Sequence, residues 1–111
     1  SLECDLMSRV TKEELRDLTG LTETEVGNSQ LERTIAEAEN FVDAYTGRSW
    51  SASDGEYSKV QTVTRLLAAS LIYDSLPSTP ETQDKAQRYH EKAMMMLKAM
   101  RVLDSGPLKR V

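Results

Sequence analysis

Apolar residues recur at steps of three and four along most of this 111-residue sequence, and this spacing constrains its fold more than any other feature. Residues so spaced lie on one side of an α-helix, whereas a half-buried strand needs strict alternation. The clearest row consists of Leu31, Ile35, Ala38, Val42 and Tyr45, with Phe41 beside it. Gly47 follows the row where a left-handed glycine commonly ends a helix. The sequence therefore predicts a helix from Asn28 or Ser29 to Gly47.

A short helix is predicted between Thr11 and Gly20. Thr11 and Glu14 have the spacing of a capping box, in which each side chain accepts a hydrogen bond from the other residue's backbone N–H. Val10 and Leu15 have the spacing of a hydrophobic staple at the same helix start. Gly20 stands where a left-handed residue would end the helix.

A third helix is predicted from Tyr57 or Ser58 to Ser75. The stretch Leu66–Tyr73 is apolar nearly all round, apart from one serine. A helix that is apolar on all sides is usually buried, so this helix is expected to be the central one of a small bundle. Pro77 follows closely and prevents the helix from continuing.

The last helix is predicted from Pro80 to about Leu103. Thr79 is a suitable N-cap, and proline is favoured at the first helical position because its missing N–H costs nothing there. Residues 104–107, Asp-Ser-Gly-Pro, are predicted to stop the helix. The residues expected to face the core are Ala86, Tyr89, Ala93, Leu97 and Met100.

These elements predict an all-α fold, a small bundle of one short and three long helices with a loop between the second and third. Residues 1–10 are expected to form a flexible N-terminal segment, residues 11–104 a single helical domain, and residues 105–111 a C-terminal tail. The sequence has no run of about 18 apolar residues, so no membrane-spanning segment is expected.

The sequence contains none of the residue patterns that commonly carry catalysis. Its single histidine, His90, and single cysteine, Cys4, cannot supply the several convergent ligands of a zinc site. It has no Gly-x-Ser-x-Gly elbow, no Gly-x-Gly-x-x-Gly and no phosphate-binding Gly-Lys-Ser/Thr loop. We therefore expect no enzyme activity, no metal and no cofactor, and we expect His90 to be half-buried on its helix.

Two apolar features are candidates for contact with a partner. Trp50 lies in a polar loop, where it either folds back over the end of the bundle or is exposed as an anchor for a partner. Residues 94–96 are three consecutive methionines, which span too much of a helix for all of them to face inward. They either fill the core or, with Met95 outward, form an adaptable contact surface.

Charge is distributed unevenly along the chain. Residues 1–55 carry 12 acidic and 5 basic side chains, a net charge of −7, whereas residues 56–111 carry 6 acidic and 9 basic ones, a net charge of +3. The second helix would be the recognition helix of a helix-turn-helix protein, yet it carries four acidic residues that DNA phosphates would repel, Glu32, Glu37, Glu39 and Asp43. Sequence-specific binding of nucleic acid is therefore not expected. The uneven charge is either a chance asymmetry of an ordinary solvated surface or a pair of complementary patches that guide contact between copies.

The order of these features resembles the head–tail connector, or adaptor, proteins of tailed bacteriophages and prophages. The resemblance spans Thr11–Leu103, and its most recognisable part is the exit of the second helix, residues 41–50, FVDAYTGRSW. That segment is similar to a family pattern of Ile-x-x-Tyr-x-Gly-Arg-x-aromatic. Each short motif is unspecific alone, and the resemblance rests on their order and spacing.

The resemblance implies a structural protein of the virion neck that is assembled in the host cytoplasm. About a dozen copies would form a ring beneath the portal protein, extend the DNA channel and dock the next neck or tail-completion protein. The residues expected at partner contacts are Arg48, Trp50, Met95, Leu108, Lys109 and Arg110. The alternative is a small helical interaction or regulatory subunit of a bacterial complex, which would stay monomeric or dimeric.

Overall fold

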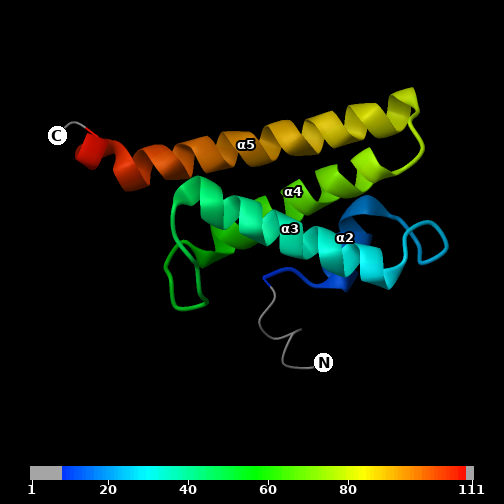
Figure 1. The fold of residues 1–111 in the computed structure, drawn as a ribbon, viewed down its shortest axis with the longest axis horizontal. Coiled ribbons are helices and arrows are strands. Elements are labelled where there is room, and N and C mark those ends of the chain that lie inside the picture. Colours follow the sequence, from blue (N-terminus) through cyan, green and yellow to red (C-terminus); the bar gives the residue numbers. More distant parts are fainter. Residues whose placement is uncertain (1–8, 110–111) are drawn as a thin grey trace.

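A computed structural model describes the backbone of residues 9–109 and the side chains of residues 9–100, and over this range the chain forms four helices and no strands. The all-α prediction is confirmed. One helix is short and three are long, in the order α2 (Lys12–Thr19), α3 (Asn28–Thr46), α4 (Tyr57–Ser75) and α5 (Pro80–Lys109). Helix α5 lies along one side of the molecule, α3 crosses in front of α4, and α2 closes the end near the start of α3 (Figure 1).

Helix α4 is the central element, as its apolar sequence predicted. It packs against α2, α3 and α5. Its buried side chains come from every side of the helix and include two polar ones: Val60, Val63, Thr64, Leu67, Ala68, Ala69, Ser70, Ile72 and Tyr73. The buried polar groups are satisfied locally, since the Thr64 hydroxyl donates to the Val60 carbonyl and the Ser70 hydroxyl donates to the Ala86 carbonyl of α5.

Helix α2 has the predicted ends. The Glu14 N–H donates to the Thr11 hydroxyl over 3.1 Å, and the Thr11 N–H donates to the Glu14 carboxylate over 2.9 Å. Gly20 adopts the left-handed conformation, with φ of 74°, and its N–H donates to the Arg16 carbonyl. A side chain with a β-carbon would be strained at that angle, so glycine suits this position.

Helix α3 begins at Asn28 as predicted, but neither Asn28 nor Ser29 caps it. The capping position is Gly27, which makes no side-chain cap hydrogen bond. The Asn28 amide is instead used in the loop before the helix, where it accepts from Arg16 over 2.8 Å and donates to Glu23 over 3.0 Å. These bonds hold the turn between α2 and α3.

Helix α5 has the predicted start and a different end. The Thr82 N–H donates to the Thr79 hydroxyl, which makes Thr79 the cap before Pro80. The helix then continues to Lys109, so the predicted end near Leu103 is wrong. A proline inside a helix loses one backbone hydrogen bond, a cost of about 3 kcal/mol, and bends a helix without always ending it. Figure 1 shows α5 changing direction near its C-terminal end.

The N-terminal boundary also differs from the prediction at two residues. Arg9 and Val10, which were assigned to the flexible segment, are both buried. Val10 joins Leu15 in the core, because the staple that starts α2 requires the residue before the cap to pack inward. The rest of that segment, residues 1–8, lies outside the described residues.

Two tyrosines connect the end of α2 to the other helices. The Tyr73 hydroxyl of α4 donates to the Thr19 carbonyl over 2.7 Å, and the Tyr89 hydroxyl of α5 donates to the Leu18 carbonyl over 3.4 Å. Their rings stack, with centroids 5.9 Å apart. Burial raises the pKa of the Tyr73 hydroxyl, so it stays protonated as a donor. Among the described residues, no helix is both long and apolar enough to cross a membrane.

We expect Leu97→Ala to lower the free energy of unfolding by about 2–5 kcal/mol, because it leaves a cavity beside the core. Leu97 is fully buried on α5, whereas Met95, two positions earlier, is 72% exposed. The control Met95→Ala should therefore change the free energy of unfolding by less than about 0.5 kcal/mol. Urea denaturation followed by circular dichroism measures both, and equal losses would contradict this packing of α5.

Candidate functional site

The exit of α3 is a short, hydrogen-bonded unit that presents Arg48 and Trp50. Gly47 takes the left-handed conformation, with φ of 78°, and its N–H donates to the Asp43 carbonyl over 2.8 Å. The Arg48 N–H donates to the same carbonyl over 3.2 Å. These bonds satisfy the helix end and turn the chain sharply, so the next residues fold back beside α3.

Trp50 folds back against the bundle. Its ring is half-buried and packs against the core, and its Nε1–H donates to the Thr46 hydroxyl over 2.9 Å. The Arg48 guanidinium lies over the ring, with Cζ 4.0 Å from the centroid, as in a cation–π contact. Of the two alternatives raised by the sequence, these contacts favour the covering role, although one face of the ring carries an exposed arginine.

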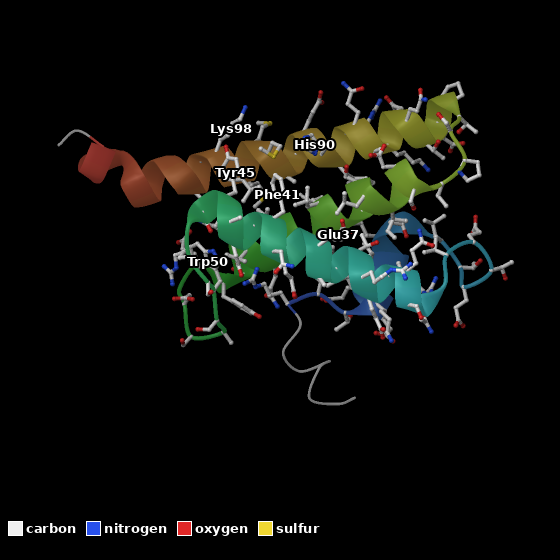
Figure 2. The ribbon with its side chains drawn as sticks, in the orientation of Figure 1. Glu37, Phe41, Tyr45, Trp50, His90 and Lys98 are labelled. Carbon is white, nitrogen blue, oxygen red and sulfur yellow. The ribbon has the colours of Figure 1, made fainter. Side chains whose placement is uncertain are left out.

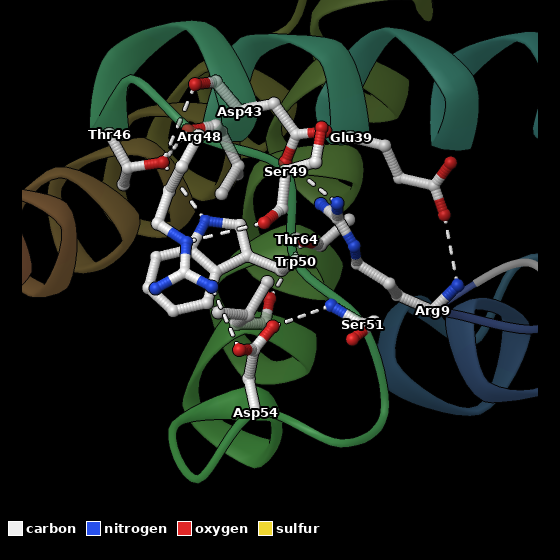
Figure 3. A network of polar contacts seen from close by, with 12 residues as sticks. Arg9, Glu39, Asp43, Thr46, Arg48, Ser49, Trp50, Ser51, Asp54 and Thr64 are labelled. Carbon is white, nitrogen blue, oxygen red and sulfur yellow. Dashed lines mark hydrogen bonds and ion pairs between the residues drawn. The ribbon is translucent and has the colours of Figure 1, made fainter.

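Asp54 orders the rest of this loop. Its carboxylate accepts the Ser51 N–H over 2.7 Å and the Arg48 Nη2 over 2.8 Å. The hydrogen bond from the Ser51 backbone, and then the one from Arg48, hold the pKa of Asp54 below its ordinary value of 3.8. Figure 3 shows that Asp54, Arg48 and Trp50 form a connected series of contacts.

Arg9 lies on the other side of the same helix exit and ties the N-terminal residues to α3. Its N–H donates to the Glu39 carboxylate over 2.9 Å, and its Nη2 donates to the Asp43 carboxylate over 2.7 Å. Its carbonyl accepts from the Gln61 amide of α4. Arg9 is 7% exposed, and its Nη1 is buried with no partner among the described residues. Figure 3 shows Arg9 between the start of the domain and α3.

Exposed apolar side chains are found on both α3 and α5. Among the described side chains, Phe41 and Met95 are the exposed large hydrophobic ones, at 42% and 72%. Phe41 stacks on Tyr45, one turn later on α3, with centroids 6.1 Å apart. Figure 2 shows both rings lying between α3 and α5. Exposed aromatic and methionine side chains are the kind that protein interfaces use.

The structure therefore brings some of the predicted contact residues together and leaves others apart. Arg48 and Trp50 contact each other, whereas Met95 lies on α5 and faces outward, as the three consecutive methionines predicted. Leu108 and Lys109 belong to the last turn of α5, where side chains are not described. Arg110 lies outside the described residues.

His90 is exposed, and the expectation that it would be half-buried is wrong. His90 directly follows Tyr89, which faces inward. Because successive residues of an α-helix are rotated by about 100°, the His90 side chain faces outward. Over the described range, no three His, Cys, Asp or Glu side chains are grouped so that they could hold a metal ion.

Neither the exposure of Phe41 nor the burial of Arg9 was predicted from the sequence. Phe41 lies at the margin of the apolar row on α3, and its exposure depends on how closely α5 approaches. Arg9 carried no local signal, because its partners Glu39 and Asp43 lie 30 and 34 residues later. The position of Arg9, directly before the hydrophobic staple residue Val10, was the one feature of the sequence that suggested its burial.

Comparison with known proteins gave no match, whether to a protein-family model, to a curated protein or to a solved structure.

We expect the loop around Trp50 to loosen in acid. The pKa of Asp54 is lowered, so its ionised form stabilises the loop above the ordinary pKa of 3.8, and this stabilisation is lost as the pH falls through the lowered value. The indole N–H resonance of Trp50, followed by NMR between about pH 5 and pH 2, should shift over that range. Asp54→Asn should show the acid-form resonance already at neutral pH.

The matched control for this loop is Asp74→Asn, because Asp74 is exposed at the far end of α4. It should leave the indole titration unchanged. Circular dichroism at each pH separates loosening of the loop from loss of the helices. If the chemical shift of the Trp50 indole N–H changes neither with pH nor with Asp54→Asn, the Asp54 carboxylate does not order the loop.

Arg9→Met should lower the free energy of unfolding by about 1–3 kcal/mol, because it leaves the partly buried Asp43 without its partner. The Arg9 and Asp43 side chains are 7% and 30% exposed. The control Arg88→Met removes a pair with Asp84 whose side chains are 73% and 58% exposed, and should cost no more than about 1 kcal/mol. Urea denaturation of both variants measures the difference, and a loss for Arg9→Met no larger than the control's would overturn it.

Proposed function

We propose that this chain is a structural subunit of the head–tail connector of a tailed bacteriophage or prophage. About a dozen copies form a ring beneath the portal protein, extend the DNA channel and dock the next neck or tail-completion protein. Such a subunit acts by assembling into the ring and forming part of the channel wall, and it uses neither a cofactor nor bond-making chemistry. Its place is the virion neck, with assembly in the host cytoplasm.

The observation that carries this proposal is the exit of α3. Residues 41–50 are the part of the sequence that most resembles the connector pattern, and they form one ordered unit around Gly47. Gly47 makes the sharp turn, the Arg48 guanidinium lies over the Trp50 ring, and Trp50 packs on the core. A preformed, semi-rigid loop loses little conformational freedom on binding, which suits a contact with the portal or a neighbouring copy.

The exposed side chains and the charge distribution give further support. A ring needs two different surfaces on each copy that fit each other. The first half of the chain is acidic and the second half is basic, with Phe41 exposed on α3 and Met95 exposed on α5. Net acidity also suits a channel through which DNA must pass without being held.

Size-exclusion chromatography with light scattering, over a wide range of protein concentrations, tests the ring directly. We expect a species of about a dozen times the 12.5 kDa chain mass at high concentration. The proportion of this species should fall as the salt concentration rises, because complementary charges contribute to the contact. Negative-stain electron microscopy of that fraction should show closed rings.

A monomer or dimer at every concentration would rule out a ring that assembles unaided. Co-sedimentation with the portal protein encoded in the same genome then separates the remaining possibilities. Binding to the portal would identify a connector that assembles only on that template. No binding would contradict the connector and favour the alternative, a small helical interaction or regulatory subunit of a bacterial complex.

A further inference from the structure

The loop after α3 contains the single Asp-Gly pair of the sequence, Asp54–Gly55. An aspartate followed by glycine is chemically reactive, because glycine has no β-carbon to keep its backbone nitrogen away from the aspartate side chain. Attack by this nitrogen closes a five-membered imide ring, which water reopens on either side. One reopening restores aspartate, and the other yields isoaspartate, in which the main chain runs through the aspartate side chain.

The attacking nitrogen of Gly55 is unhindered. Gly55 is exposed, and its N–H makes no hydrogen bond among the described residues. Apart from the adjacent residues, no heavy atom lies within 4 Å of the place that a β-carbon would take. The other aspartates with described side chains lie inside helices, where the next backbone N–H is bonded along the helix: Asp17, Asp43, Asp74 and Asp84. Asp54 is therefore the described aspartate whose neighbouring nitrogen is free to react.

The Asp54 carboxylate, by contrast, is restrained at both of its oxygens. Oδ2 accepts the Ser51 N–H over 2.7 Å, and Oδ1 accepts the Arg48 Nη2 over 2.8 Å (Figure 3). These two bonds limit rotation of the side chain toward the Gly55 nitrogen. The bond from Ser51, and then the one from Arg48, also hold the pKa of Asp54 below its ordinary value. An ionised carboxylate resists attack, because its oxygen leaves as water only after protonation.

We propose that Asp54–Gly55 is a site of isoaspartate formation, and that the Ser51 N–H and Arg48 slow the reaction while they hold the carboxylate. A bond forms between the Gly55 nitrogen and Asp54 Cγ, and the bond from Cγ to its hydroxyl oxygen breaks. That hydroxyl leaves as water with the proton of the Gly55 amide. A second water then attacks the backbone carbonyl carbon of Asp54 and breaks its bond to the nitrogen. One water leaves and one returns, so the reaction needs no oxidant and the mass of the chain is unchanged.

Formation of isoaspartate changes the loop that carries Trp50. The main chain becomes one carbon longer, and the carboxylate is then attached directly to the α-carbon. From there it cannot keep both the Ser51 and the Arg48 hydrogen bonds. Arg48, whose Cζ lies 4.0 Å from the centroid of the Trp50 ring, loses its ion-pair partner and is held over the ring less firmly. This inference concerns the loop of a single chain, so it does not depend on the proposed ring.

The test follows isoaspartate in the full chain during incubation at neutral pH, with and without guanidinium chloride. Chymotrypsin cleaves after Trp50 and Tyr57, which releases the peptide 51–57 with Asp54 as its one aspartate. The aspartate and isoaspartate peptides have the same mass, separate by reversed-phase chromatography and are identified by electron-transfer fragmentation. We expect isoaspartate to accumulate in the native chain, and to accumulate several times faster in guanidinium chloride, where the contacts of the carboxylate are lost.

Three variants separate the restraint from the reactivity of the pair itself. Arg48→Met should raise the native rate about two- to fivefold, a range that suits the loss of a partly exposed ion pair. In guanidinium chloride it should react as fast as the wild type. Gly55→Ala, for which the structure has room, should slow the reaction under both conditions, because the added β-carbon hinders the nitrogen. The control Arg88→Met, which removes an exposed ion pair with Asp84 on α5, should leave the rate at Asp54 unchanged.

Circular dichroism checks that each variant keeps its helices. The native chain with isoaspartate at position 54, once purified, should also show a shifted NMR resonance of the Trp50 indole N–H, because the loop around the ring has changed.

Several results would overturn this inference. If isoaspartate forms at Asp54 in neither the native nor the unfolded chain, the pair is not a site of this reaction. If the native and unfolded chains react equally fast, or if Arg48→Met leaves the native rate unchanged, the contacts of the carboxylate do not slow the reaction. Isoaspartate that forms in the unfolded chain but never in the native one, even with Arg48→Met, would also contradict it. An unshifted indole resonance would show that the change does not loosen the loop around Trp50.

Discussion

The burial of α4 on all sides is the constraint on which the rest of this structure depends. Small side chains let neighbouring helices approach it closely, and the buried Ser70 hydroxyl reaches a carbonyl of α5. Helices α3 and α5 can each cover only part of α4, so each presents one apolar side to it and keeps the other in water. Because close-packed interiors leave little room for adjustment, the position of α4 decides where the outer surfaces of α3 and α5 lie.

The outer surfaces of α3 and α5 are the parts of these helices that can contact other proteins. Most apolar side chains of α3 and α5 pack inward, whereas Phe41 on α3 and Met95 on α5 remain exposed. The loop after α3 is organised differently, by hydrogen bonds and by the contact of Arg48 with Trp50. The described residues thus offer a hydrogen-bonded loop and two exposed apolar side chains, features that suit association with other chains.

Local chemistry explains why the helix ends were predictable. The capping box at Thr11, the left-handed glycines and the Thr79–Pro80 start each need atoms a few residues apart, so the sequence order already places them together. The contact between Arg48 and Trp50 is equally local. Arg9 could not be predicted in the same way, because its partners lie on α3 and are distant in the sequence. The continuation of α5 past Pro107 was missed because proline usually, but not always, ends a helix.

The sequence by itself determined the helical class of this protein, the number of helices, most of their ends and the inward side of each. Apolar periodicity and capping act within one helix, where the backbone geometry is already known. The tertiary structure alone decided that Phe41 on α3 stays exposed and how Arg9 is buried. These depend on how closely whole helices approach one another, and side-chain packing between distant segments sets that distance.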